Sequence, residues 1–236
     1  MKILSLIPAR CGSKGIPNKN IVDVNGKPLI YYSIHQAIQL REKGLVDEVV
    51  VSTDCEKIAE ISKKYGAQVP FLRPKNIAGD DSKSIEFYLH ALSFFEKKGV
   101  YFDAVLLLQP TSPIRSQDIL EKAINTFIEG DSNSLISIYK EEYINDLVMY
   151  KLGKSGCLEA LNRSHNKGVR RQEHGDILVR NGSIYLTRST YLKREQNIIS
   201  NNPLFVESPK QHSINIDTYE DLELARVVLK RVELGG

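Results

Sequence analysis

The stretch Ile3-Leu4-Ser5-Leu6-Ile7-Pro8-Ala9-Arg10-Cys11-Gly12-Ser13-Lys14-Gly15 is a short apolar run that leads directly into a polar loop. A run of this length is typical of a buried strand. In the loop, Gly12 and Gly15 let the backbone turn its N–H groups around an anion, and Arg10 and Lys14 add positive charge. Simple glycine turns with solvated basic side chains fit the same spacing. The position directly after a buried strand favours a phosphate site, because α/β sheets bind phosphates there.

Beyond this loop, apolar runs alternate with segments of helical periodicity. The expected strands are residues 3–7, 48–52, 104–108, 135–138, 181–187 and 213–216, and the expected helices are residues 28–39, 56–65, 84–98, 116–129 and 218–232. Asp54 is expected to cap the second helix, and Thr218, with Asp221 three residues on, the last. Continuous apolar strands that alternate with helices predict a doubly wound, mostly parallel α/β sheet of the Rossmann-like kind. The loops after Ile7, Ser52 and Leu108 should therefore share one site.

The alternation stops between Tyr139 and Val179. We therefore expect an α/β core formed by residues 1–138 and 180–236, with residues 139–179 as an inserted arm. An excursion of this size is suited to packing on a second subunit, so we expect a homodimer.

Composition excludes several classes of protein. The formal net charge of the 236 residues is only +3, and the basic residues are scattered, which argues against nucleic acid or a membrane surface as a partner. No apolar run approaches the roughly 20 residues that cross a bilayer, and the N-terminus does not resemble a signal peptide. Cys11, Cys55 and Cys157 form neither a disulfide framework nor a Cys-x-x-Cys pair. We expect reduced thiols and a cytoplasmic protein.

The loop matches neither the Walker A pattern nor the Gly-x-Gly-x-x-Gly dinucleotide fingerprint. It is one of six motifs that recur in a shared order: residues 7–15 with Lys19-Asn20, Ser52-Thr53-Asp54, Leu72-Arg73-Pro74, Leu107-Leu108-Gln109-Pro110-Thr111-Ser112-Pro113, Arg180-Asn181-Gly182-Ser183-Ile184-Tyr185, and Ser213-Ile214-Asn215-Ile216-Asp217-Thr218. Together they closely resemble the CMP-sialic acid synthetases, the N-acylneuraminate cytidylyltransferases and their relatives for legionaminic and other nonulosonic acids.

The resemblance implies a fold of the nucleotide-diphospho-sugar transferase type and a reaction between CTP and a free nonulosonic acid. The anomeric hydroxyl of the sugar attacks the α-phosphorus, and pyrophosphate leaves with Mg²⁺. Such a site must neutralise the triphosphate and align the attacking oxygen.

The resemblance also assigns roles to nucleotide-binding residues, which are Arg10, Gly12, Ser13, Lys14, Asn20, Arg73, Ser84 and Gln109. Arg10 and Lys14 are the expected catalytic contacts to the triphosphate, and Arg73 is the expected contact to cytidine. Three interpretations stay open: Lys19 as a solvated side chain, Ser84 as a helix cap, and Gln109 as a partner of its own turn.

For the sugar, the resemblance points to Gln109, Arg171, Asn181, Tyr185 and Phe205, with Gln172 next to Arg171. Tyr185 suits a sugar face, although ordinary strand packing explains it equally well. Arg115 is a further candidate to pair with a carboxylate, that of the sugar included.

The last motif departs from the family, whose members usually present Asp-x-Asp where this chain reads Asn215-Ile216-Asp217. On a strand, a period of two places both side chains on one face, where they could share hydrated magnesium. Asp217 is the expected catalytic metal ligand, and Asn215 offers a neutral oxygen beside it.

Two alternatives to this activity are considered. A 3-deoxy-manno-octulosonate cytidylyltransferase shares the chemistry, but that family carries a Gln-Gly-Asp type of motif in place of Gln-Pro-Thr-Ser-Pro. A nucleotide-binding module without catalysis is favoured only by Asn215, and the set Arg10, Lys14, Arg73, Gln109 and Asp217 argues against it.

Overall fold

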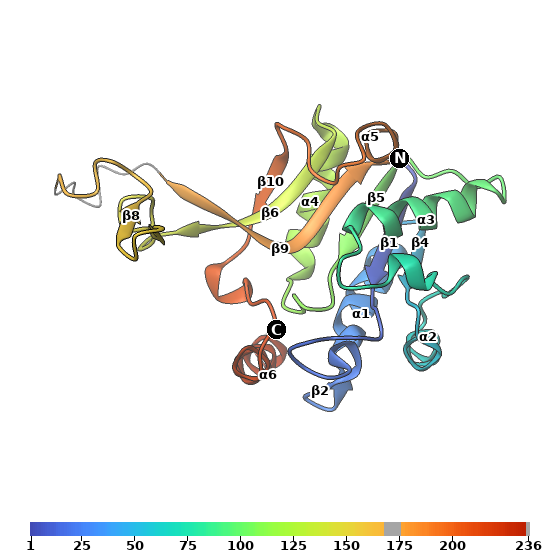
Figure 1. The fold of residues 1–236 in the computed structure, drawn as a ribbon. Coiled ribbons are helices and arrows are strands. Elements are labelled where there is room, and N and C mark those ends of the chain that lie inside the picture. Colours follow the sequence, from blue (N-terminus) through green and yellow to red (C-terminus); the bar gives the residue numbers. More distant parts are fainter. Residues whose placement is uncertain (168–175, 235–236) are drawn as a thin grey trace.

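The computed structural model describes residues 1–167 and 176–234. Its core is a six-stranded sheet in the order β10-β6-β9-β5-β1-β4 (Figure 1). These strands are β1 (Ile3–Pro8), β4 (Glu48–Ser52), β5 (Ala104–Leu108), β6 (Ser134–Glu141), β9 (Ile177–Arg188) and β10 (Leu204–Glu207). β1 runs parallel to β4 and β5, and β10 parallel to β6, whereas β9 lies antiparallel between β5 and β6. The prediction of a mostly parallel α/β sheet is confirmed.

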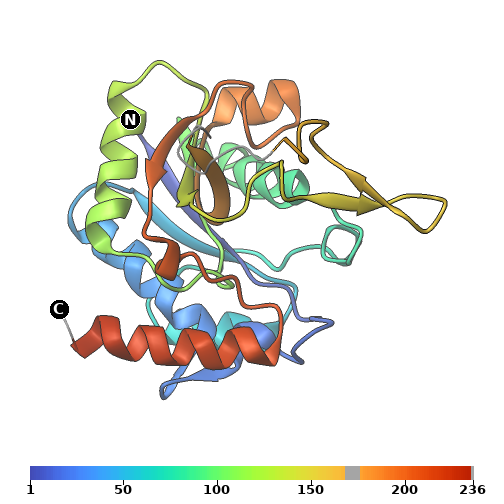
Figure 2. The ribbon, with the colours of Figure 1, turned by 90° about the vertical axis from the view of Figure 1, so that its left-hand side faces the viewer.

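Helices cover both faces of the sheet because alternate residues of each central strand point to opposite sides. Ile3 and Ile7 face α1 (Leu29–Glu42), α2 (Glu56–Lys64) and α4 (Gln117–Glu129). Leu4 and Leu6 face α3 (Ser84–Glu96) and α5 (Ser189–Glu195). Figure 2 shows α4 and α3 on opposite sides of the sheet. The central strands carry continuous apolar runs because both of their faces are buried, as expected from the sequence.

The C-terminal helix α6 (Tyr219–Leu234) packs away from the sheet, on the loop that follows β1. Leu222, Ala225 and Leu229 contact a small cluster that contains Ile16 and Val24. Val24 belongs to the short pair β2 (Asp23–Val24) and β3 (Lys27–Pro28). This packing brings the start of α6 next to the nucleotide loop predicted from the sequence.

An arm leaves the core between β6 and β9, and Figure 1 shows it projecting from the sheet. The two strands stay paired as far as Glu141 and Ile177, so the ladder continues slightly beyond the expected boundaries at 139 and 179. The arm carries a hairpin of β7 (Tyr150–Leu152) and β8 (Leu158–Ala160). Its exposed apolar side chains include Ile144, Leu152, Leu158 and Leu161.

Three local predictions are wrong. Residues 213–216 form no strand, because Ile216 N makes a single hydrogen bond, to Thr111 O, and no ladder. The edge strand β10 was not predicted, since its short run is framed by polar residues and proline. Asp54 does not cap α2: Cys55 occupies the N-cap without a side-chain bond, and Asp54 binds the loop after β1 instead.

Candidate active site

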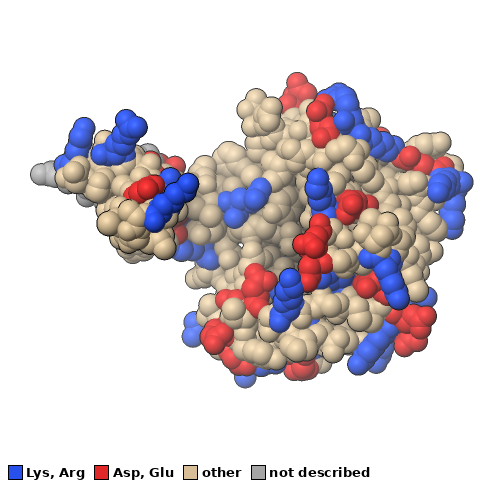
Figure 3. All heavy atoms as spheres, viewed as in Figure 1, with Lys and Arg blue, Asp and Glu red and all other residues tan. Residues whose placement is uncertain are grey.

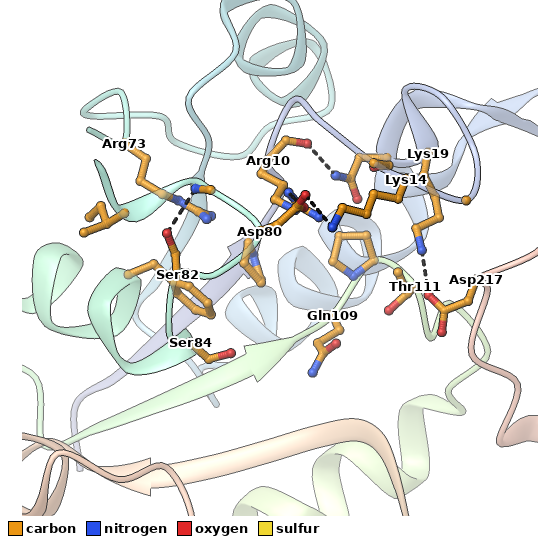
Figure 4. A pocket seen from close by; sticks show the side chains of 18 of the residues that line it. Arg10, Lys14, Lys19, Arg73, Asp80, Ser82, Ser84, Gln109, Thr111 and Asp217 are labelled. Atoms are coloured by element: carbon orange, nitrogen blue, oxygen red, sulfur yellow. Dashed lines mark hydrogen bonds and ion pairs between the residues drawn. The ribbon is translucent and has the colours of Figure 1, made fainter. Parts of the chain in front are cut away.

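A cavity of about 430 Å³ opens where β1, β4 and β5 end, at the edge of the sheet that the sequence predicts for ligand binding. It is lined by the loop after β1, the segment before α3, the loop after β5 and Asp217 (Figure 4). The lining residues are Pro8, Arg10, Ser13, Lys14, Gly15, Lys19, Asn20, Arg73, Ile77, Gly79, Asp80, Ser82, Lys83, Ser84, Phe87, Gln109, Pro110, Thr111 and Asp217. Most of the nucleotide residues expected from the sequence therefore converge on one pocket.

Arg10 and Lys14 share a single carboxylate partner, Asp80. Arg10 forms an ion pair with one oxygen of Asp80, and Lys14 Nζ lies 3.0 Å from the other. Hydrogen bonds from Lys14 and Arg10 hold the pKa of the Asp80 carboxyl below its ordinary value. Asp80 is thus an anion among the charges expected to bind a triphosphate, and sequence reasoning did not assign it a role.

The loop after β1 is held in place from two sides. The buried Asn20 donates from Nδ2 to Arg10 O at 3.0 Å, and Asp54 Oδ1 accepts from Cys11 N at 2.8 Å. Asn20 both lines the pocket and fixes the backbone that presents Arg10. Gly12 is exposed and does not line the pocket, and a Cβ at this position would meet open space.

Arg73 is buried against the end of β4, with only 6% of its surface exposed. Its Nε donates to Ser52 Oγ at 3.1 Å and its Nη2 to Ser52 O at 2.5 Å. The guanidinium also lies 5.0 Å from the centre of the Phe87 ring. Burial lowers the pKa of Arg73 to about 10, so the group remains a cation at neutral pH. Ser52 explains why Arg73 holds a fixed position in the pocket wall.

Ser84 is the first residue of α3 and not its cap. The N-cap is Lys83, whose backbone N–H donates to Glu86 Oε2 at 2.8 Å. Ser84 is exposed and lines the pocket. Of the two interpretations left open for Ser84, the helix cap is excluded and the position at the pocket agrees with a ligand contact.

Gln109 lines the pocket at the end of β5, and its backbone carbonyl is fixed by Arg115. Arg115 Nη2 donates to Gln109 O at 2.5 Å, Nε donates to Ser183 O at 2.9 Å, and Nη1 donates to the side chains of Ser33 and Gln36. Burial lowers the pKa of Arg115 to about 9. The suggestion that Arg115 pairs with a carboxylate is not supported, because its donors are occupied by neutral oxygens that join β5 to β9.

Asp217 projects at the far end of the pocket with 74% of its side chain exposed, paired with Lys19. Lys19 is 13% exposed and donates to Asp217 Oδ1 at 2.8 Å and to Ile216 O at 2.7 Å, so it is not a solvated lysine. The prediction that Thr218 caps α6 is confirmed, since Thr218 Oγ1 accepts from Asp221 N at 3.2 Å. Asp221 Oδ2 accepts from Thr218 N in return, and this hydrogen bond lowers the pKa of Asp221. The Asp217 carboxylate therefore does not cap α6, and it lies at the pocket wall paired with Lys19.

Gly15 lets the loop after β1 approach Asp217 closely. A Cβ on Gly15 would lie 2.2 Å from Asp217 O, which is too close for any side chain. The absence of a side chain at Gly15 therefore lets the loop after β1 contact the segment at Asp217, in addition to any role around phosphate.

Asn215 does not line the pocket. Its Oδ1 accepts from Ser112 Oγ at 2.5 Å, and its Nδ2 donates to Asn181 O at 3.3 Å. Asn215 thus joins the turn after β5 to β9. Among residues 1–167 and 176–234, no group of three or more His, Cys, Asp or Glu side chains is placed to hold a metal ion.

The Arg180-Asn181-Gly182-Ser183 motif forms an irregularity in β9, where its register with β6 shifts. Gly182 has φ +74°, and the buried Asn181 bonds Ser137, Ser183 and Ser213 through its side chain. Asn181 therefore has a structural role that explains the motif without a sugar, and it lies outside the pocket lining.

Of the other expected sugar residues that the structure describes, Tyr185 and Phe205 do not line the pocket. Tyr185 is half-buried against the cluster under α3, and burial raises the pKa of its phenol. Phe205 is 54% exposed on the edge strand β10. Arg171 and Gln172 lie outside the described residues. Among the members of this set that are described, Gln109 alone lines the cavity.

Charges of both signs are interspersed over the face that contains the pocket (Figure 3). This mixture agrees with the small net charge of the chain. Within the described ranges, no helix is both long enough and apolar enough to span a membrane.

Comparison with known proteins matches residues 4–233 to a family model described as cytidylyltransferase. A pseudaminic acid cytidylyltransferase of Campylobacter jejuni subsp. jejuni serotype O:2 is 36% identical over 230 residues, which cover 98% of this chain and 97% of that protein. A CMP-N,N'-diacetyllegionaminic acid synthase of Legionella pneumophila is 33% identical, with coverage of 98% and 97%.

Among solved structures, a CMP:2-keto-3-deoxy-manno-octonic acid synthetase complexed with CTP superposes with a TM-score of 0.70. The superposition covers 98% of this chain and 99% of that chain at 19% sequence identity, so it concerns the fold alone.

Proposed function

The chain belongs to the cytidylyltransferase family, and from this premise we propose that it transfers CMP from CTP to the anomeric hydroxyl of a nonulosonic acid, releasing pyrophosphate. It is a nucleotidyltransferase by family, and the two relatives above act on sugars of the nonulosonic class by name.

One observation carries the proposal, namely the convergence of Arg10, Lys14 and Arg73 on one pocket at the carboxyl ends of β1 and β4. Charge-assisted hydrogen bonds from such groups suit a nucleoside triphosphate. Arg73 lies on one side of the pocket and Lys14 on the other, which leaves room for the two ends of a nucleotide (Figure 4).

In the proposed reaction Arg10 and Lys14 exchange the Asp80 carboxylate for phosphate oxygens. They hold the triphosphate while negative charge passes to the leaving pyrophosphate. Arg73 and Ser84 line the part of the pocket suited to the nucleoside, and Asn20 holds the backbone that presents Arg10. Gln109, whose backbone is held by Arg115, offers a neutral amide where the sugar must approach the α-phosphorus.

We further propose Mg²⁺ as the cofactor, with Asp217 as its protein ligand. The fit rests on an exposed carboxylate at the pocket wall, since Mg²⁺ keeps several waters and takes one or two carboxylates beside substrate phosphates. Magnesium bound there supplies charge neutralisation for the leaving pyrophosphate. Asn215 does not fit a ligand role, because it lies outside the pocket lining and its amide is bonded at both ends, to Ser112 and to Asn181.

We propose that the protein works as a homodimer in the cytoplasm, where CTP is available, without nucleic acid or membrane as a partner. Exposed apolar side chains on the arm, among them Leu152 and Leu158, support an arm that packs on a second copy.

The test is a pyrophosphate-release assay with CTP, Mg²⁺ and a panel of pseudaminic, legionaminic and N-acetylneuraminic acids and 3-deoxy-manno-octulosonate. We expect release only when CTP and a nonulosonic acid are both present. Arg10→Met should abolish it. Arg194→Met should not, because Arg194 is an exposed residue of α5, at the opposite end of the sheet. No turnover with any nonulosonic acid would refute the proposal, and turnover with the octulosonate alone would identify the alternative enzyme.

A further inference from the structure

Two cysteines lie side by side behind the nucleotide loop. β1 and β4 are parallel and in register up to Pro8 and Ser52, so Cys11 and Cys55 each follow their strand by three residues. The segments that follow the two strands stay together beyond the ladder. Ala9 N donates to Ser52 O at 2.9 Å, and Cys11 N donates to Asp54 Oδ1 at 2.8 Å. Cys55 is the N-cap residue of α2, where the chain turns under the loop.

The side chains of these two residues interact, and this interaction with Cys55 is the main reason why the pKa of Cys11 is raised. Cys11 is exposed and Cys55 is half-buried against the core. Neither lines the cavity, although Arg10, Ser13 and Lys14 of the same loop do. The pair therefore sits on the face of the loop turned away from the pocket.

We propose that Cys11 and Cys55 are a redox-sensitive pair that forms a reversible intramolecular disulfide, tying the nucleotide loop to the start of α2. Adjacent parallel strands that continue side by side provide the Cα separation that a disulfide requires. An exposed thiol with a second thiol beside it can be oxidised reversibly to a disulfide.

A low-molecular-weight disulfide such as oxidised glutathione serves as the oxidant. The Cys11 thiolate attacks one sulfur of the oxidant and releases the first glutathione, leaving a mixed disulfide. The Cys55 thiolate then attacks the Cys11 sulfur and releases the second glutathione. In total two protein thiols are oxidised to one disulfide, and the oxidant is reduced to two thiols that carry the two protons.

The bond has a consequence for CTP, and this part of the proposal rests on the proposed function. A disulfide holds its sulfurs about 2 Å apart, closer than two thiols in hydrogen-bond contact. It therefore draws Cys11 toward α2 and away from the pocket. Arg10 and Lys14 flank Cys11, so oxidation shifts the charges that hold the triphosphate and weakens CTP binding.

The test uses the full chain with Cys157→Ser, which removes the remaining thiol, an exposed one on the distant arm. After incubation with oxidised glutathione we expect loss of both thiols, a monomeric mass lower by two hydrogens, and a Cys11–Cys55 linked peptide after non-reducing digestion. Dithiothreitol should restore both thiols. Recovery of two unreacted thiols, of stable glutathione adducts or of disulfide-linked dimers alone would overturn the proposal.

A matched variant, Cys55→Ser in the same background, should stop at the glutathione adduct on Cys11. CTP binding, measured by titration calorimetry, should be at least about tenfold weaker in the oxidised protein than in the reduced one, given the cost of a small misplacement at such a site. Equal affinity in the two forms would overturn the coupling to the loop. Failure of the reduced protein to bind CTP would count against the proposed function, while the linked peptide still reports on the disulfide.

Discussion

Asp80 forms an ion pair with Arg10 inside the pocket and binds Lys14 through its other carboxylate oxygen. An incoming triphosphate must compete with this carboxylate for both cations. Replacing Asp80 by Asn removes the competing charge, so we expect CTP to bind roughly five-fold more tightly, as for a partly exposed ion pair. Titration calorimetry measures the change, and Asp81→Asn, which alters the same net charge at the next residue, is the control. Weaker binding by the Asp80 variant would mean that Asp80 itself supports the nucleotide.

Gly15 and Gly12 form a matched pair of substitutions in one loop. Alanine at Gly15 would place a Cβ 2.2 Å from Asp217 O, whereas alanine at Gly12 meets open space. We expect Gly15→Ala to cost about 1–3 kcal/mol in the free energy of unfolding, as overpacking does, and Gly12→Ala to leave stability within about 0.5 kcal/mol. Chemical denaturation measures both. Equal stabilities would show that the contact between the loop and Asp217 O yields at little cost.

The metal assignment separates Asp217 from Asn215. Asp217→Asn removes the exposed carboxylate at the pocket, so the Mg²⁺ concentration for half-maximal turnover should rise at least about tenfold. Asn215→Asp should leave that concentration unchanged, because the side chain lies outside the pocket lining and is bonded to Ser112. A sharp fall in the magnesium requirement of Asn215→Asp would show that residue 215 reaches the metal.

At the base of the arm, Glu141 binds Lys210 and accepts hydrogen bonds from Tyr143 N and Ile144 N. The bond from Lys210, followed by that from Tyr143 N, lowers the pKa of Glu141 to about 2. The ionised Glu141 carboxylate therefore stabilises the fold at pH values above its unfolded-state pKa of about 4.3. This stabilisation is lost as the pH falls to the folded-state pKa near 2. Glu141→Gln should therefore have a lower Tm than the native chain at pH 7 and an equal Tm near pH 2. A constant difference across this range would exclude ionisation as the cause.

The arm is expected to carry the dimer contact. Leu152 and Leu158 are paired across the β7–β8 hairpin and are 76% and 68% exposed. Aspartate at both positions should convert the dimer to a monomer in sedimentation velocity experiments, because burying an unpaired charge is costly. Ile128→Asp is the control for an added charge elsewhere, because Ile128 is an exposed residue of α4. A native chain that sediments as a monomer would remove the basis of the proposed dimer.

The sequence by itself determined the elements and their kind. The strands at β1, β4 and β5 and the helices α1 to α4 follow from apolar runs and helical periodicity, which are local properties. It also placed Arg10 and Lys14 at the edge of the sheet where the pocket lies, because they directly follow a buried strand. The cap at Thr218 was also predictable from a local pattern, since its partner Asp221 is three residues away.

The tertiary structure decided which distant groups meet. Asp54 could be read as a helix cap, but the register of β1 on β4 brings it to Cys11 N and places Cys55 against Cys11. Asn215 could be read as a strand residue beside a metal, but Ser112, more than a hundred positions earlier, binds its side chain. Asp80 reaches Arg10 because the segment before α3 and the loop after β1 line the same pocket. These contacts depend on strand order and packing, which set distances between residues that no local pattern relates.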